Sequence, residues 1–137
     1  MGYYTNFSLT ASACTVSGGS ASTSSIPSIT LISLEDEIEK MNVFDTGNSI
    51  EHGYYAYAKW YDWKEDMSLL SKRFPEILFY LHGEGESSDD LWDAYFLGGK
   101  SQYCHAVITY EDFNPEKLRS VVVDDDTSDW PYSYQNL

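Results

Sequence analysis

Charge is missing from the first quarter of this chain. Residues 1–34 of the 137 contain no Asp, Glu, Lys, Arg or His, and all 22 acidic and 8 basic residues follow them. The formal net charge of −14 therefore belongs to residues 35–137. A field of this sign repels nucleic acid and anionic membranes and attracts basic protein surfaces. We therefore expect a protein partner, with no direct contact to nucleic acid or membrane.

Cysteines and long apolar runs are also scarce. Cys14 and Cys104 are too few for a disulfide scaffold, and we expect free thiols. No apolar run approaches the roughly 18 residues that cross a bilayer, and the first residues lack the basic start of a secretory signal. These absences predict a cytoplasmic protein, located in the host cytoplasm if the chain is viral.

Aromatic residues, in contrast, are plentiful. The chain has 12 Tyr, 6 Phe and 4 Trp, whereas disordered acidic chains are poor in aromatics. Its length is typical of one domain, so we predict a single folded domain over residues 1–137. Residues 11–28, rich in Ser, Thr, Ala and Gly, suit a flexible loop or a weak hairpin, and we expect a mobile insertion there. Residues 124–137 should form an acidic tail.

Hydrophobic periodicity predicts the elements and their arrangement. Alternation predicts strands over 3–10, 54–61, 77–82, 91–97 and 101–110, with short strands at 29–32 and 121–123. Gly98-Gly99 suits a tight hairpin turn. Helices are predicted from the cap Ser33 to about Asn42, from the cap Asp62 to Phe74, and briefly after Asn114. This order predicts an α+β fold, an antiparallel sheet with helices packed on one face, in the ferredoxin-like order β-α-β-α-β-β.

Helix 62–74 has a well-defined apolar face. Trp63, Met67, Leu70 and Phe74 follow one another at helical spacing. We expect these four side chains to pack against the sheet.

Five short motifs follow one another along the middle of the chain: Lys59-Trp60-Tyr61-Asp62-Trp63-Lys64-Glu65-Asp66-Met67, Phe74-Pro75, Leu81-His82-Gly83-Glu84-Gly85-Glu86, Asp90-Leu91-Trp92 and Gly99-Lys100. Together with Gly2-Tyr3-Tyr4-Thr5, they resemble a group of small acidic phage and prophage proteins of unsettled function. The resemblance covers roughly residues 54–103 and the first strand, and leaves out the Ser/Thr-rich stretch. It implies a virus-associated setting, in which small acidic proteins often block a host protein.

An acidic loop is the first candidate site. Glu84, Glu86, Asp89 and Asp90 place four carboxylates within seven residues, a set that could bind Ca²⁺ or Mg²⁺. The EF-hand spacing is absent, and a solvated loop is the simpler interpretation. His82, on the same strand face as Glu84, either forms an acid–base couple with it or is an exposed strand-end histidine. Zinc spacings and nucleophile motifs are missing, so we assign no catalytic residue, metal or cofactor.

Two functions of different classes follow from these features. The first is a non-enzymatic, phage-type inhibitor, an anti-CRISPR or DNA mimic, that binds a basic, nucleic-acid-binding host defence protein. Duplex DNA carries about one charge per 1.7 Å of axis, and a track of carboxylates can compete for the same Lys and Arg residues. The predicted partner-binding residues are Asp62, Glu65, Asp66, Glu84, Glu86, Asp89, Asp90, Asp93, Trp130 and Tyr132.

The alternative is a small metal-dependent enzyme or nucleotide-binding domain that uses the carboxylate loop at residues 82–90. Two further interpretations of the sequence are consistent with its composition. The acids could serve only to keep an aromatic-rich protein in solution, or the chain could be a virion component.

Overall fold

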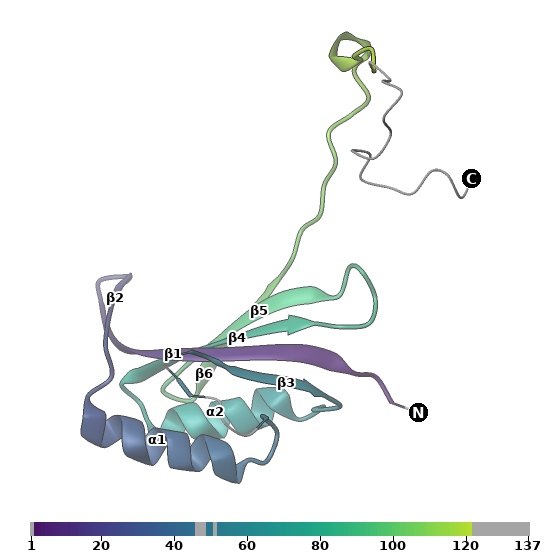
Figure 1. Ribbon diagram of the computed structural model, residues 1–137. Helices are drawn as coiled ribbons and strands as arrows, with labels where there is room; N and C mark the ends of the chain where they lie inside the picture. The colour runs from purple at the N-terminus through teal and green to yellow at the C-terminus, as the bar shows by residue number, and fades with distance from the viewer. Residues whose placement is uncertain (1, 46–48, 51, 122–137) are drawn as a thin grey trace.

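The computed structural model describes residues 2–45, 49–50 and 52–121. Its elements are β1 (Thr5–Ser17), β2 (Ser20–Ser24), α1 (Ser28–Lys40), β3 (Tyr54–Ala58), α2 (Trp63–Arg73), β4 (Ile77–Glu84), β5 (Leu91–Leu97), β6 (Lys100–His105) and a 3₁₀ turn at Pro115–Lys117. The six strands form one antiparallel sheet, and both helices lie on the same side of it (Figure 1). The predicted α+β class is confirmed.

Strand β1 is central to the sheet. Its 13 residues are long enough to pair with two short strands placed end to end along one edge. Along one edge, its first residues pair with β3 and its last residues pair with β2. Along the other edge, residues 6–13 pair with β4, which continues to β5 and β6. Strands β3 and β4 therefore flank β1, and α2 joins them across the helical face.

The predicted ferredoxin-like order is wrong. The β alternation of β1 continues past Thr10, and Gly18 and Gly19 adopt φ values of 58° and 84° that turn the chain back as β2 before the first helix. Residues 11–17 and 20–24, predicted as part of a mobile insertion, are thus strand residues in the structure. The sheet gains a hairpin that the predicted order does not contain.

The first helix begins earlier than predicted. Residues 29–32, predicted as a strand, are helical, because α1 starts at Ser28 and the amide of Leu31 donates to the carbonyl of Pro27. Ser33 is therefore inside the helix and is not its cap. Packing of Leu34 and Ile38 into the core outweighs the β propensity of the isoleucines at 29 and 32.

Helix α2 and the final hairpin match the predictions. Met67 and Leu70 of α2 are buried, and Trp63 and Phe74 pack against the same core, although the Asp62 side chain makes no capping hydrogen bond. The Gly98-Gly99 turn joins β5 to β6.

The chain leaves the sheet after β6. The strand predicted over 101–110 ends at His105, and the amide of Ala106 makes the last bond, to the carbonyl of Leu91. Residues 106–114 then run away from the domain (Figure 1). Asn114 caps the 3₁₀ turn as predicted, by accepting from the amide of Glu116 at 3.0 Å. Residue 121 belongs to no strand, and the rest of the predicted strand 121–123 and the acidic tail lie outside the described residues.

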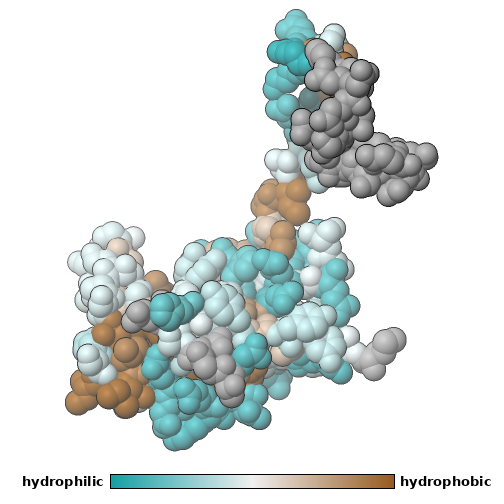
Figure 2. All heavy atoms as spheres, in the orientation of Figure 1, coloured by the Kyte–Doolittle hydropathy of each residue, from teal (hydrophilic) through white to brown (hydrophobic). Residues whose placement is uncertain are grey.

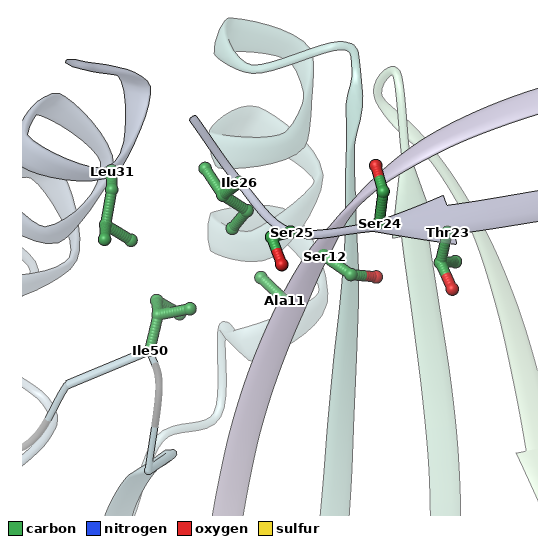
Figure 3. Close-up of a pocket in the computed structure, with 8 residues that line it drawn as sticks. All are labelled: Ala11, Ser12, Thr23, Ser24, Ser25, Ile26, Leu31 and Ile50. Atoms are coloured by element: carbon green, nitrogen blue, oxygen red, sulfur yellow. The ribbon is translucent and has the colours of Figure 1, made fainter. Parts of the chain in front are cut away.

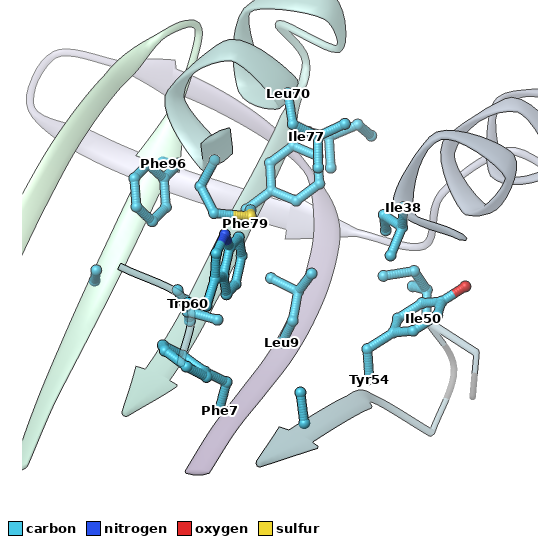
Figure 4. Packing of buried hydrophobic residues seen from close by; sticks show 14 of the residues in the cluster. Phe7, Leu9, Ile38, Ile50, Tyr54, Trp60, Leu70, Ile77, Phe79 and Phe96 are labelled. Atoms are coloured by element: carbon cyan, nitrogen blue, oxygen red, sulfur yellow. The ribbon is translucent and has the colours of Figure 1, made fainter. Parts of the chain in front are cut away.

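The core fills the space between the sheet and the helices (Figure 4). Alternate residues of β1, β4 and β5 enter it, while Leu34, Ile38, Met67 and Leu70 close it from the helices. The intervening strand residues, including Tyr80, His82, Asp93 and Tyr95, lie on the opposite face, which no described helix covers. Among the described residues, neither helix has the length and apolar character needed to cross a bilayer.

Candidate functional site

The acidic loop between β4 and β5 is held closed by the first residues of the chain. The Tyr3 hydroxyl donates to Oδ2 of Asp90 at 2.6 Å and accepts from the amide of Ser87 at 3.1 Å. The amide of Tyr4 donates to Oε2 of Glu86 at 2.7 Å. Two of the four loop carboxylates therefore hold the loop in place. Within the described part of the chain, no three His, Cys, Asp or Glu side chains gather as metal ligands.

His82 lies between two carboxylates on the uncovered face of the sheet. Its Nδ1 is 2.7 Å from Oδ1 of Asp93, its cross-strand neighbour, and its Nε2 is 2.9 Å from Oε2 of Glu84. The Tyr80 hydroxyl donates to the same Asp93 oxygen at 2.9 Å. This network joins β4 to β5 and brings together two of the predicted partner-binding residues, Glu84 and Asp93.

The charge state of His82 follows from these contacts. Partial burial lowers the pKa of His82, but the hydrogen bonds and negative charges of Asp93 and Glu84 outweigh that effect and raise its pKa above 6.5. When the ring is protonated, both nitrogens donate to carboxylates. The couple of His82 with Glu84 considered from the sequence is thus formed, but neither ring nitrogen is left for a substrate.

A pocket lined by aromatic rings lies beside the acidic loop. It measures about 270 Å³, and its lining comes from the N-terminal segment, the start of α2, the loop end and the final hairpin. The lining residues are Tyr3, Thr5, Phe7, Trp60, Tyr61, Trp63, Asp90, Trp92 and Tyr103. Asp90 thus belongs both to the loop and to the pocket.

Three rings of the pocket pack on one another. Trp63 stacks on Trp92 with ring centroids 4.2 Å apart and an interplanar angle of 14°. Tyr103 lies beside both, at 6.2 Å from Trp63 and 5.8 Å from Trp92. The Gly98-Gly99 turn sets this arrangement, because its register pairs Tyr103 with Ala94 and so makes Tyr103 a diagonal neighbour of Trp92.

Gly83 makes room for the Trp92 indole. The two residues are cross-strand partners, and a Cβ at position 83 would overlap three atoms of the indole ring. Glycine is needed at position 83 because the indole ring approaches the backbone so closely.

A hydrogen bond to Asp66 holds the Trp60 ring, whose Nε1 donates to Oδ2 of Asp66 at 2.7 Å. Asp66, predicted to bind a partner, is therefore used within the domain.

The pocket combines ring faces with negative charge. Burial raises the pKa of the Tyr103 hydroxyl, and the charge of Asp90 raises it further. Lys64 does not line the pocket, but its ammonium lies 5.5 Å from the ring centroid of Trp63 and 5.2 Å from that of Tyr103. These ring faces thus already attract a cation of the chain itself.

The predicted partner-binding residues fall into three groups. Glu84, Glu86, Asp66, Asp90 and Asp93 all have partners inside the domain. Asp62, Glu65 and Asp89 are exposed, as are Glu84 and Glu86 of the first group, and Trp130 and Tyr132 lie outside the described residues. Sequence reasoning missed the pocket, although the register implied by Gly98-Gly99 places Tyr103 and Trp92 on one face.

A second hollow, of about 530 Å³, lies between the β1–β2 hairpin, α1 and Ile50 (Figure 3). Its lining is entirely aliphatic or hydroxylic and has no titratable group: Ala11, Ser12, Thr23, Ser24, Ser25, Ile26, Leu31 and Ile50. Next to it, Ile29 and Ile32 are 80% and 73% exposed, and Figure 2 shows an apolar surface over this part of the molecule. The hollow has no group for acid–base or metal chemistry.

No family model, curated protein or solved structure matches the chain.

Proposed function

We propose that this chain is a binding protein of phage or prophage origin that occupies and blocks the basic surface of a nucleic-acid-binding host defence protein. One observation carries the proposal: exposed carboxylates are the chain neighbours of residues that line an aromatic pocket. Asp62 lies between the lining residues Tyr61 and Trp63, and Asp89 precedes the lining residue Asp90. Interfaces favour this combination of aromatic anchors and a charged rim.

The rim carboxylates and the paired carboxylates have different roles. Asp62, Glu65 and Asp89 are exposed to solvent, so they are accessible to Lys and Arg side chains of a partner. Glu86 and Asp90 shape the surface by holding the loop on Tyr3 and Tyr4. Exposed rim charges act mainly on the association rate, and the net charge of −14 extends that attraction beyond the contact.

The alternative function, a small metal-dependent enzyme or nucleotide-binding domain, has less support than a binding protein. Both ring nitrogens of His82 face carboxylates, and Glu86 and Asp90 are bound to the N-terminal segment. The described residues offer no cluster of three ligands. No observation favours this alternative over binding.

The test is capture of the partner followed by kinetics. The full chain is used as bait in host lysate, the captured protein is identified by mass spectrometry, and association is measured with the purified pair between 50 and 500 mM salt. We expect a basic nucleic-acid-binding protein, competition by its nucleic acid, and an association rate that falls steeply with salt, because exposed charges are screened over about 10 Å at 0.1 M.

Charge reversal provides the matched comparison. Asp62→Lys with Asp89→Lys should lower the association rate about tenfold or more. Glu39→Lys with Glu76→Lys changes the net charge equally, on α1 and at the far end of β4, and should have a smaller effect. An acidic partner, or equal binding across a tenfold range of salt, would overturn the proposal. If the carboxylates serve only solubility, the two double variants should behave alike.

A further inference from the structure

The aromatic pocket has the size of a site for one side chain. Its volume of about 270 Å³ lies below the roughly 300–1,000 Å³ of pockets that hold drug-sized ligands. Its walls come from four separate segments, and the stack of Trp63 on Trp92 holds two of its rings in a defined orientation.

The pocket also has an unneutralised carboxylate. The Tyr3 hydroxyl uses Oδ2 of Asp90, and no hydrogen bond to Oδ1 is formed within the described residues. The ion pairs between described residues involve other carboxylates, namely Asp36, Glu37, Glu84, Asp93 and Glu111. The Lys64 ammonium lies over the rings of Trp63 and Tyr103 without forming an ion pair with Asp90. A cation from outside the chain would therefore reach a free carboxylate oxygen, and on the rings of Trp63 and Tyr103 it would take the place of the Lys64 ammonium.

We propose that this pocket receives an arginine side chain of the basic partner protein, an inference that rests on the proposed function. A guanidinium is planar, stacks on aromatic rings, donates in its own plane to a carboxylate and is more weakly hydrated than an ammonium. Trp63 and Tyr103 supply the rings, Trp92 supports the Trp63 ring by stacking on it, and Asp90 supplies the acceptor. An arginine that contacts phosphate in the partner's own complex would be removed from nucleic acid in this way.

Small arginine ligands test the pocket directly. The probe is N-acetyl-arginine N-methylamide, and the control is the citrulline analogue, which has nearly the same shape and no charge. Binding to the full chain is followed through the indole N–H signals of ¹⁵N-labelled protein, with Trp63 and Trp92 assigned by substitution. We expect saturable shifts of these two signals with arginine at millimolar concentration, and at least tenfold weaker binding of citrulline. Equal effects of the two ligands, or no shift with arginine, would overturn the inference.

Two variants separate the pocket from the general negative field. Asp90→Asn keeps an oxygen for the Tyr3 hydroxyl and removes the charge, so arginine binding should weaken at least tenfold while the chain stays folded. Glu76→Gln removes the same charge at the opposite end of β4 and should leave arginine binding unchanged. Equal losses in both variants would mean that arginine responds only to net charge, and the inference would be wrong. Trp63→Leu should also abolish binding, with folding checked by urea unfolding.

The complex with the partner distinguishes this inference from the proposed function. If a basic partner binds with strong salt dependence but Asp90→Asn and Trp63→Leu leave its affinity unchanged, the pocket inference fails and the proposed function stands. If arginine binds selectively and no basic protein partner binds, the proposed function fails and the pocket remains an arginine site.

Discussion

Replacing Gly83 by alanine tests the packing on which the aromatic pocket depends. Gly83 is buried in β4, and its missing Cβ is the space that the Trp92 indole occupies. The ring has little freedom to move away, because Trp92 is 6% exposed and its other contacts include the stack with Trp63 at 4.2 Å and the edge contact with Phe7 at 6.0 Å. A methyl group at position 83 must therefore displace the ring.

The expected cost can be derived from this geometry. Overpacking of a core typically costs about 1–3 kcal/mol, while a change from glycine to alanine recovers about 0.4–1 kcal/mol through the unfolded chain where the backbone is compatible. The φ of Gly83 is not positive, so that gain applies. We expect a net loss of about 1–2 kcal/mol, or roughly 3–7 °C in Tm for a chain of this length.

Urea unfolding followed by far-UV circular dichroism measures this loss. The comparison includes the wild type, Gly83→Ala, Trp92→Leu and the double variant. If the Trp92 ring causes the cost, Gly83→Ala should be neutral or slightly stabilising in the Trp92→Leu background, with a coupling of about 1–2 kcal/mol. An equal cost of Gly83→Ala in both backgrounds would refute the reasoning.

Three further predictions concern α2, His82 and the first hairpin. Met67→Ala should lower the free energy of unfolding by about 2–5 kcal/mol, because Met67 is fully buried; a loss of only a few tenths in urea unfolding would contradict this. The raised pKa of His82 means that its stabilisation is complete below about pH 6.5 and is lost as the pH rises through the folded-state value. The stability of the wild type should therefore fall relative to His82→Gln between pH 5.5 and 8.5, and parallel pH profiles would show that the network contributes nothing. Replacing residues 15–22 by two glycines should leave the chain folded, because β2 is exposed throughout and Cys14 and Thr23 are cross-strand partners; loss of a cooperative unfolding transition would show that the hairpin is essential.

Elements with strong local signals were predictable from the sequence. Helix α2 has a regular apolar stripe between Asp62 and Pro75, and the β5–β6 hairpin has alternating arms around Gly98-Gly99. Both depend on residues close together in the chain, where period and turn chemistry decide the conformation. The start of α1 was predicted wrongly for the complementary reason, since strand-forming isoleucines there belong to a helix that tertiary packing holds.

The sequence drew attention to the acidic loop, but it did not predict the contacts that its carboxylates make. Asp90 accepts a hydrogen bond from the Tyr3 hydroxyl, 87 residues away in the chain, and Glu86 accepts one from the amide of Tyr4, 82 residues away. Such contacts depend on which strands become neighbours, and no local pattern specifies that. The pocket was not predictable either, because its lining residues are spread along the chain from Tyr3 to Tyr103.

Composition, period and turn residues act locally, and they were enough to predict the antiparallel α+β class, the acidic character of residues 35–137, helix α2 and the final hairpin. Long-range packing determines strand pairing, so it is the folded domain that sets β2 and β3 along one edge of β1. It also decided that most loop carboxylates have internal partners and that Trp63, Trp92 and Tyr103 surround a pocket with Asp90. A side chain's neighbours are set by how separate segments pack in the folded domain.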